Sequence, residues 1–492
     1  MRKKAVVIGA GFSGLAAATV LASKNYDVTV IEKNSTPGGR ARKFEAGGFT
    51  FDMGPSWYWM PDVFDDYFNR FGKKVSDFYD LRRLNPSYKV FFGKDDALSL
   101  PGSVEGMVSL FESMEAGSGN QLRRFLKEAE YKYNVGMKDF VYNPSYSIFN
   151  FVSPKLALAG IRMQMFTSFH NYVRRFFKNP RLLQILEFPI LFLGGTAKNI
   201  PAMYSLMNYG DIALGTWYPM GGMFKIIQGM TTLASSLGVS FQYSETVEGF
   251  EISSGKITGV RTLGCSYKTD AIVASADYHH VEQHLLQEAY RRYSPKYWNS
   301  RVLSPSALIY YIGVNKKLKN LEHHNLFFDQ DFGPHADAIY KNPSWPENPS
   351  FYVCCATATD ASQAPEGHEN LFVLVPVAPG ILDTKENRDH YYNVLMDRLE
   401  RITGESIRAH VVYKRSYAHN DFERDYNAYK GNAYGLANTL RQTAFLKPAL
   451  RSRKLGNLFY AGQLTVPGPG VPPALISGQV AANEIVRIIG KG

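Results

Sequence analysis

Residues 5–18 read AVVIGAGFSGLAAA, a short apolar strand that runs into a glycine turn and then into an alanine-rich helix. Gly9 permits the tight turn after the strand, and Gly14 allows the helix to pack closely on it. Gly11 lets the backbone approach a pyrophosphate group at the helix N-terminus, where free N–H groups favour an anion. This spacing predicts an α/β fold that begins with a Rossmann-like nucleotide-binding unit.

A second strand and a second glycine turn follow in the register that such a unit requires. Residues 27–32 read DVTVIE, so that Glu32 ends the strand and can accept hydrogen bonds from ribose hydroxyls. Residues 37–40, PGGR, form a further glycine turn with a cation. Flavoproteins of the glutathione-reductase and amine-oxidase type share this turn, whereas NAD-only domains normally lack it. The cofactor predicted is therefore FAD.

The opposite end of the chain holds the second half of the site. Residues 457–472 read NLFYAGQLTVPGPGVP, which predicts a strand, a Gly/Pro-rich turn and the start of a helix. A large cofactor bound by both termini explains this pattern. The candidate FAD-binding residues are Gly9, Gly11, Gly14, Glu32, Gly38, Gly39, Arg40, Gly54, Gly462, Gln463, Gly470 and Val471.

The length of 492 residues predicts two or three domains, which are discontinuous if both termini share one site. Strand patterns at 239–243, 246–250, 256–260 and 270–276 indicate a return to the nucleotide domain in mid-chain. We therefore expect FAD-binding parts at 1–75, 226–300 and 426–492. The substrate domain is expected to comprise a membrane-associated region at 76–225 and a sheet at 301–425.

The net charge indicates the class of binding partner, and the cysteine content indicates the cellular location. The net charge of +11 favours anionic partners, and lipid head groups fit better than nucleic acid because no nucleic-acid-binding motif is present. Three cysteines, two of them adjacent, predict a reducing, cytoplasmic location. No apolar stretch reaches the roughly 18–20 residues of a spanning helix. Any membrane attachment is expected to be peripheral.

Taken together, these segments resemble the bacterial and fungal phytoene desaturases, carotenoid desaturases related to the amine oxidases. The resemblance covers nearly the whole chain. It rests on the glycine motifs above and on residues 49–55, 217–223, 304–306, 364–367 and 462–472. It implies an FAD-binding domain, a mixed α+β substrate domain and adenine contact near Val247. Where relatives often carry a Thr-His-Pro turn, this chain has Leu464-Thr465-Val466-Pro467, which leaves the product open.

The activity that the resemblance implies is stepwise desaturation of phytoene to lycopene, with electrons passed from FAD to oxygen or a quinone. Alternatives of the same chemistry are desaturation, isomerisation or ketolation of a later carotenoid, or desaturation of a C30 carotenoid. An amine oxidase and a flavin-free prenyl-binding escort protein are alternatives of other classes. The oligomeric state stays open.

An apolar substrate fits the aromatic content of 14%, although ordinary core aromatics explain part of it. The densest aromatic group predicts the substrate domain. Residues 156–177 mix apolar and basic side chains, which is compatible with an interfacial amphipathic helix or with a helix that packs inward. The aromatic group comprises Phe140, Tyr142, Tyr146, Phe149, Phe151, Phe166, Phe169, Tyr172, Phe176, Phe177, Phe188 and Phe192.

No catalytic acid or base can be identified from spacing. Asp211, Glu187 and Asp425 lie near relevant segments, yet nothing separates them from ion-pairing carboxylates. No metal site is expected, because the histidine pairs 279–280 and 323–324 lack the i, i+4 spacing of a ligand pair and the cysteine pair 354–355 lacks a second pair.

Overall fold

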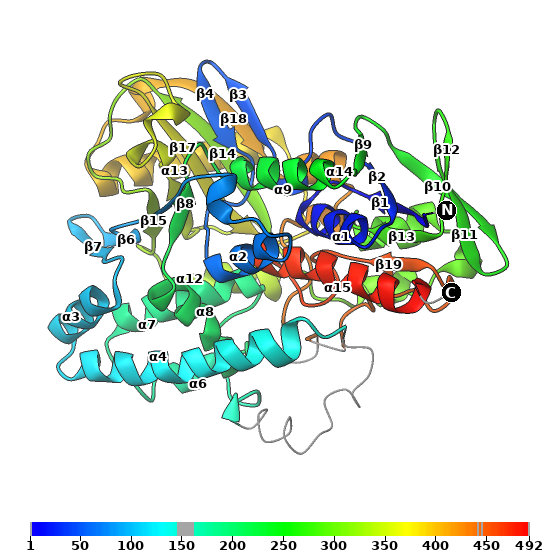
Figure 1. The fold of residues 1–492 in the computed structure, drawn as a ribbon. Coiled ribbons are helices and arrows are strands. Elements are labelled where there is room, and N and C mark those ends of the chain that lie inside the picture. The colour runs from blue at the N-terminus through cyan, green and yellow to red at the C-terminus, as the bar shows by residue number, and fades with distance from the viewer. Residues whose placement is uncertain (1, 145–161, 440–441, 444–445, 491–492) are drawn as a thin grey trace.

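The computed structural model describes residues 2–144, 162–439, 442–443 and 446–490. Two sheets organise this part of the chain, a five-stranded parallel sheet beside the termini and a seven-stranded sheet at the other end of the molecule (Figure 1). Helices line the lower side of the molecule in the same view.

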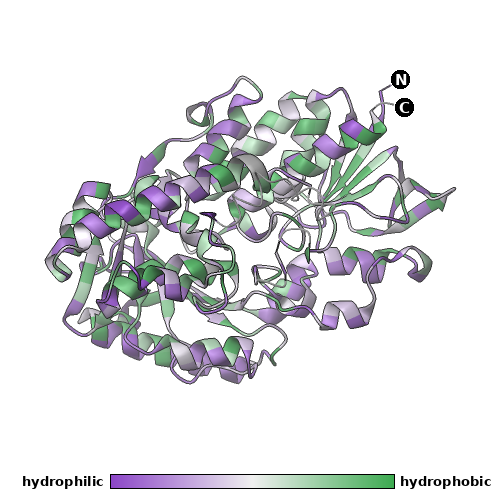
Figure 2. Cartoon of the chain, turned by 90° about the horizontal axis from the view of Figure 1, so that it is seen from below, coloured by the Kyte–Doolittle hydropathy of each residue, from purple (hydrophilic) through white to green (hydrophobic). Residues whose placement is uncertain are grey.

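The five-stranded sheet draws on the beginning, the middle and the end of the chain. Its order is β19-β13-β1-β2-β9, with every pair parallel. Its strands are green in Figure 2 beside the two termini, as expected for a sheet covered on both faces. The predicted α/β fold built from both termini is confirmed. The strands are β1 (Lys4–Ile8), β2 (Asp27–Ile31), β9 (Ser240–Gln242), β13 (Ala271–Ala274) and β19 (Leu458–Tyr460).

Three helices cover this sheet: α1 (Phe12–Ser23), α9 (Phe224–Ser236) and α15 (Val471–Ile489). Helix α1 is buried over residues 12–21 because it packs against both α9 and α15 (Figure 1). A Cβ atom at Gly478 of α15 would lie 2.0 Å from the carbonyl oxygen of Ser13, so only glycine allows this approach. The C-terminal helix thereby locks onto the first one.

Three small antiparallel sheets complete the strand arrangement of the described residues. The mid-chain strands predicted at 246–250 and 256–260 form one of them, and each extends two or three residues further than predicted. The sheets are β3 (Lys43–Ala46) with β4 (Phe49–Asp52), β5 (Leu81–Arg83) with β8 (Trp217–Pro219), and β10 (Val247–Ser253) with β11 (Lys256–Thr262) and β12 (Ser266–Lys268).

The seven-stranded sheet has the order β18-β14-β17-β16-β15-β6-β7. Its strands β6 and β7 come from the segment expected to be a membrane-associated region, and β6 pairs in parallel with β15. Both predicted parts of the substrate domain therefore contribute to one sheet. The strands are β6 (Tyr88–Gly93), β7 (Asp96–Leu100), β14 (Ser306–Val314), β15 (His324–Phe327), β16 (Phe351–Cys354), β17 (Glu369–Val377) and β18 (Val411–Tyr417).

Helix α13 (Lys385–Thr403) supplies the core on one face of this sheet. The remaining helices connect the sheets or form the lower layer of Figure 1. They are α2 (Pro61–Asn69), α3 (Val104–Met114), α4 (Ser118–Val135), α6 (Phe169–Val173), α7 (Pro180–Glu187), α8 (Leu206–Asn208), α10 (Tyr278–His280), α11 (Pro295–Asn299), α12 (Phe332–Tyr340) and α14 (His419–Tyr426).

The proposed amphipathic helix at 156–177 is not continuous where the structure describes it. Residues 156–161 lie outside the described part. Residues 163–167 form turns and a bend, and the short helix α6 begins only after Ser168, which accepts a hydrogen bond from the N–H of Asn171. Helix α7, capped by Asn179, begins beyond the predicted segment. In the described residues, no helix is long and apolar enough to cross a membrane.

Much of the aromatic group in this region is core. Phe169, Tyr172 and Phe177 are buried, and the rings of Tyr172 and Phe177 lie 5.7 and 6.1 Å from that of Phe125 on α4. Phe166, in contrast, is 88% exposed. The alternative of inward packing therefore holds for these three side chains. Tyr146, Phe149 and Phe151 lie outside the described residues.

Candidate functional site

A cavity lies between the two sheets. Its wall combines the carboxyl ends of β1, β2, β13 and β19 with Ala307 and Ile309 of β14 and Leu374 of β17. Ligands of open α/β sheets bind at this edge. Val247 lies on the wall together with all but one of the residues predicted from the glycine motifs: Gly9, Gly11, Glu32, Gly38, Gly39, Arg40, Gly54, Gly462, Gln463, Gly470 and Val471.

Gly14 is the predicted residue that does not line the cavity. A Cβ atom there would lie 1.9 Å from the carbonyl oxygen of Gly9, so Gly14 serves the contact between helix and turn. Gly9 has a φ of +98°, which favours glycine, and Gly11 faces open space. The three glycines thus divide into a turn, an open approach and a packing contact, as their spacing predicts.

Glu32 is nearly fully buried at the end of β2 and fixes the glycine turn. One carboxylate oxygen accepts a hydrogen bond of 2.8 Å from the N–H of Ala10, and the other accepts bonds of 2.9 Å from the backbone and side chain of Asn34. Contact between Glu32 and a ribose stays a prediction, although the residue lies on the cavity wall.

Arg40 places a partly buried positive charge on the wall. Its guanidinium donates a 3.1 Å hydrogen bond to the carbonyl oxygen of Asn432 and lies 5.2 Å from the ring centre of Tyr426. Its Nε is buried and has no partner among the described residues. Burial lowers the pKa of Arg40, and the nearby Asp277 carboxylate opposes that effect. An unpartnered buried donor in a glycine-lined cavity fits the phosphate groups of FAD.

Asp277 was missed by the sequence reasoning. It follows β13, lines the cavity, and caps α10 by accepting a hydrogen bond from the N–H of His280, the last residue of that helix. Burial raises its pKa to about 6. An acid directly after a buried strand, at the edge where the other strands end, was the available signal.

The C-terminal turn completes the wall. Gly462 and Gly470 have φ values of +115° and +111°, and Gly470 directly precedes α15. The N–H of Gly462 donates a 3.0 Å hydrogen bond to the hydroxyl of Ser477. Glycine is favoured at both positions because the backbone adopts left-handed conformations there, and this requirement does not depend on the flanking side chains.

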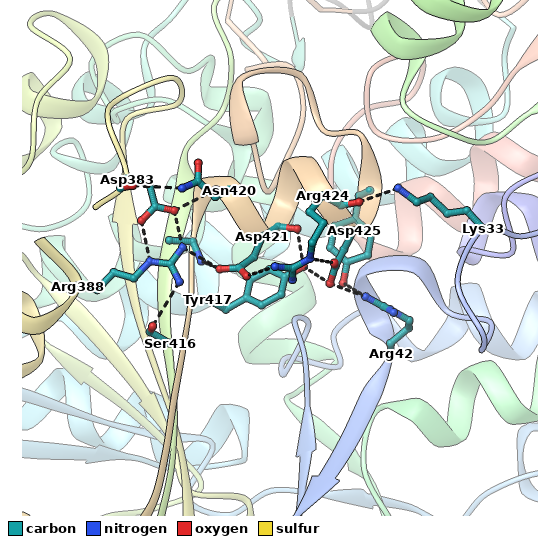
Figure 3. A network of polar contacts seen from close by, with 12 residues as sticks. Lys33, Arg42, Asp383, Arg388, Ser416, Tyr417, Asn420, Asp421, Arg424 and Asp425 are labelled. Atoms are coloured by element: carbon teal, nitrogen blue, oxygen red, sulfur yellow. Dashed lines mark hydrogen bonds and ion pairs between the residues drawn. The ribbon is translucent and has the colours of Figure 1, made fainter. Parts of the chain in front are cut away.

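The three candidate acids differ in their contacts and in their burial. Asp425 forms ion pairs of 2.9 Å with Arg42 and 2.8 Å with Arg424, and accepts a hydrogen bond from Tyr417 (Figure 3). Burial acts to raise the pKa of Asp425, but the hydrogen bonds from Arg424 and Tyr417 lower it, and the net shift is downward. Asp425 therefore joins the segment after the glycine turn to α14 and β18. Glu187 pairs with Arg174 on the partly exposed side of α7.

Asp211 is the buried member of the three. It accepts hydrogen bonds of 2.9 Å from the hydroxyl of Tyr88 and 3.3 Å from that of Thr216. Burial raises its pKa to about 7 in spite of these bonds. The ring of Tyr88 also lies 5.4 Å from that of Trp57, in the loop that leaves the cavity wall after Pro55. Asp211 thus supports an aromatic cluster next to the cavity.

Lys447 is a second residue that the sequence reasoning missed. It is 4% exposed, and its Nζ has no partner among the described residues. A Cβ atom on Gly468 would lie 3.2 Å from this Nζ and 3.0 Å from the unpartnered Oδ1 of Asn438. Burial lowers the pKa of Lys447 to about 7. A proton-accepting amine therefore lies against the turn that carries Gly470, and no local pattern could reveal its burial.

The two histidine pairs lie in different places and have different contacts. His280 lines the cavity, and His279 stacks on Tyr429 with ring centres 3.8 Å apart. His323 and His324 instead meet Cys354, and their candidate ligand atoms all lie within 4.8 Å of one another. The spacing argument missed this group because the third residue comes from the neighbouring strand β16.

The chain matches the family of flavin-containing amine oxidoreductases over residues 12–486. It is 40% identical over 486 residues to a carotenoid 3,4-desaturase of Haloarcula japonica, covering 98% of both chains. It is 30% identical over 503 residues to a 4,4′-diapophytoene desaturase (4,4′-diaponeurosporene-forming) of Staphylococcus aureus, covering 99% of this chain and all of the relative.

Solved structures share the fold at much lower identity. An oxidoreductase from Methanosarcina mazei aligns with a TM-score of 0.62 and 16% identity, over 98% of this chain and 100% of that one. A double mutant of putrescine oxidase aligns with a TM-score of 0.63 and 15% identity over 99% of both chains. The protein belongs to the flavin-containing amine oxidoreductase family, with FAD as its cofactor, and within that family to the carotenoid desaturases.

Proposed function

We propose that the protein inserts double bonds into a carotenoid. The observation that carries this is the cavity between the nucleotide-binding sheet and the substrate sheet, in a chain whose desaturase relatives match it from end to end. Phytoene, converted stepwise to lycopene, is the substrate that the sequence resemblance implies. The 40% identical relative favours a later carotenoid with a saturated 3,4 bond, and we place that substrate first.

Desaturation removes one hydrogen with its electron pair and a proton from the neighbouring carbon. FAD, when bound, supplies the two-electron acceptor for the hydride. The chain holds the cofactor through the glycines of the cavity wall, Glu32 and Arg40. Apolar side chains of β14 and β17 close the cavity on the substrate-sheet side and limit the access of water.

For the proton, we propose Lys447 as the acceptor: it lies not on the cavity wall itself but against Gly468, in the turn that carries the wall residue Gly470. Its pKa of about 7 leaves roughly half of the amine neutral at pH 7, so its Nζ can take up a proton and return it to solvent after turnover. Among the acids considered, Asp425 is held in ion pairs and Asp211 in hydrogen bonds from Tyr88 and Thr216. Lys447 has no such partner in the described residues.

We further propose that the protein docks peripherally on the cytoplasmic face of a membrane and passes electrons to oxygen or a quinone. The argument is chemical: a long hydrocarbon dissolves only in lipid, and the net charge of +11 suits anionic head groups. Exposed Phe166, in a segment with several basic residues, is the described side chain best suited to such a contact.

The test is incubation of the FAD-loaded protein with liposomes that contain one carotenoid each: phytoene, 4,4′-diapophytoene, or a conjugated carotenoid with saturated 3,4 bonds. Products are separated by chromatography and identified from absorbance spectra and mass. Conversion of any one, with a loss of two hydrogens per step, supports the proposal and identifies the substrate. Oxidation of amines such as putrescine with no carotenoid converted would overturn it.

A further inference from the structure

His323, His324 and Cys354 form a closed cluster inside the substrate sheet. His324 on β15 is the register partner of Cys354 on β16, so their side chains lie on one face of the sheet. His323 directly precedes β15, and its carbonyl oxygen accepts a 2.8 Å hydrogen bond from the N–H of Cys355. All three clustered side chains are buried.

Each imidazole is held by its Nδ1. That of His323 lies 2.8 Å from the hydroxyl of Thr359, and that of His324 lies 2.6 Å from the hydroxyl of Tyr352. The ring of Trp57 stacks on His324 at 4.0 Å, and the ring of Tyr218 lies 4.5 Å from His323. Metal-binding histidines are oriented in the same way, by a hydrogen bond at the ring nitrogen that does not bind the metal.

The opposite ring nitrogens point to a missing partner. The Nε2 atoms of both histidines are buried and have no hydrogen-bond partner among the described residues. The two rings lie 4.5 Å apart between their centres, and an unpartnered polar atom on each is unfavourable in a core; the cost disappears if both bind one ion. We propose that His323, His324 and Cys354 bind a single Zn²⁺ ion.

The donor set and the charges suit this ion. Two imidazole nitrogens and one thiolate are common zinc ligands, and a fourth position can hold water. Tetrahedral Zn²⁺ places its ligand atoms about 3.5 Å apart, so a cluster within 4.8 Å needs a contraction of about 1 Å. Asp52 lines the same small pocket as Cys354, so its carboxylate can offset the positive charge of the ion.

The ion would lie between two neighbouring strands of the sheet. It would clamp β15 to β16 beneath Trp57, two residues after Pro55 on the cavity wall. Neither ligand histidine lines the FAD cavity. The inference is therefore independent of the proposed substrate.

Cys355 supplies a matched control. It is as buried as Cys354, but its Sγ lies 3.4 Å from a carboxylate oxygen of Glu369 and 3.5 Å from the hydroxyl of Thr357, in the other hydrophobic core of the sheet. Cys354→Ser and Cys355→Ser therefore remove adjacent buried thiols that face different cores, and only the first removes a proposed ligand.

The holoprotein is produced in zinc-supplemented medium, and its zinc is measured by elemental analysis before and after competition with a chromophoric chelator. We expect about one zinc per chain in wild type and Cys355→Ser, and at least tenfold weaker binding in Cys354→Ser and His324→Gln. Tyr352→Phe should weaken binding by about tenfold through loss of the orienting hydroxyl.

The FAD absorbance spectrum of each variant shows whether it is folded. Wild-type protein that retains FAD but takes up no zinc, either in the cell or on later incubation with Zn²⁺, would overturn the proposal. Equal loss of zinc from Cys354→Ser and Cys355→Ser, with FAD retained in both, would also overturn it.

Discussion

Replacing Lys447 by methionine should stabilise the protein while it removes the proposed proton acceptor. The fold buries this ammonium against Gly468 without a partner among the described residues, and methionine matches the length of the side chain without its charge. A residue that weakens the fold is most simply explained by a role in function.

The size of the effect follows from the two pKa values of Lys447. The ordinary value is 10.5, and burial lowers it to about 7 in the folded protein. This gap of about 3.5 pKa units, at about 1.36 kcal/mol each, corresponds to about 5 kcal/mol of unfolding free energy. Because the side chain is fully buried, no correction for solvent screening applies.

The pH dependence has a definite sign. Between pH 7 and 10.5 the unfolded chain binds this proton and the folded protein does not, so wild-type stability rises with pH over that window. Below pH 7 Lys447 is protonated in both the folded and the unfolded state, so the full cost of burying its charge remains. The advantage of Lys447→Met should be greatest at pH 7 and below, and should disappear near pH 10.5.

The assay is urea unfolding of wild type and Lys447→Met, followed by circular dichroism at pH 6, 8 and 10, with desaturation measured on the same preparations. We expect a more stable, inactive variant whose advantage shrinks as the pH rises. A variant destabilised by a similar amount at every pH would refute the reasoning, because Lys447 would then contribute favourable contacts in its charged form.

Three further changes test other parts of the account. Gly11→Val should fold but lose FAD, because the added atoms extend into open space on the cavity wall; Gly264→Val, on an exposed hairpin with equally open space, should retain FAD by absorbance. Asp211→Asn should gain thermal stability relative to wild type as the pH rises from 4 to 7. Burial raises the pKa of Asp211 from 3.8 to about 7, so wild-type protein loses stability over this pH range as the buried carboxyl group is forced to ionise. Asp425→Asn should lower the melting temperature more at pH 7 than at pH 3, because the stability that comes from the lowered pKa of Asp425 is full above pH 3.8 and declines as the pH falls below it; an equal loss at both pH values would show that packing dominates.

The nucleotide-binding half of the fold could be predicted from the sequence because its signals are local. Gly9, Gly14 and the glycines of residues 462–470 are required by backbone conformation or close packing, and such requirements appear directly as residue type. The mid-chain strands were recognisable because their apolar residues occur in short runs between turns. Gly478 has the same kind of role on α15, but a single glycine within a helix carries no specific signal.

The substrate half depends on contacts between distant segments. Strand β6 pairs with β15 more than two hundred residues away, and nothing in its composition identifies that partner. The same holds for the burial of Lys447 and for the meeting of His324 with Cys354, which are determined by strand register. Asp425 could not be separated from Asp211 by sequence, since ion pairing and burial decide their different pKa values.

The central claim, that a carotenoid delivers hydride to the FAD of this protein, is tested most directly without oxygen. Oxidised holoprotein is mixed anaerobically with carotenoid-loaded liposomes, and the flavin absorbance is followed. The account predicts bleaching of the oxidised flavin with one new double bond for each flavin reduced, and no bleaching with empty liposomes. A flavin that stays oxidised with every carotenoid but is bleached by an amine would contradict it.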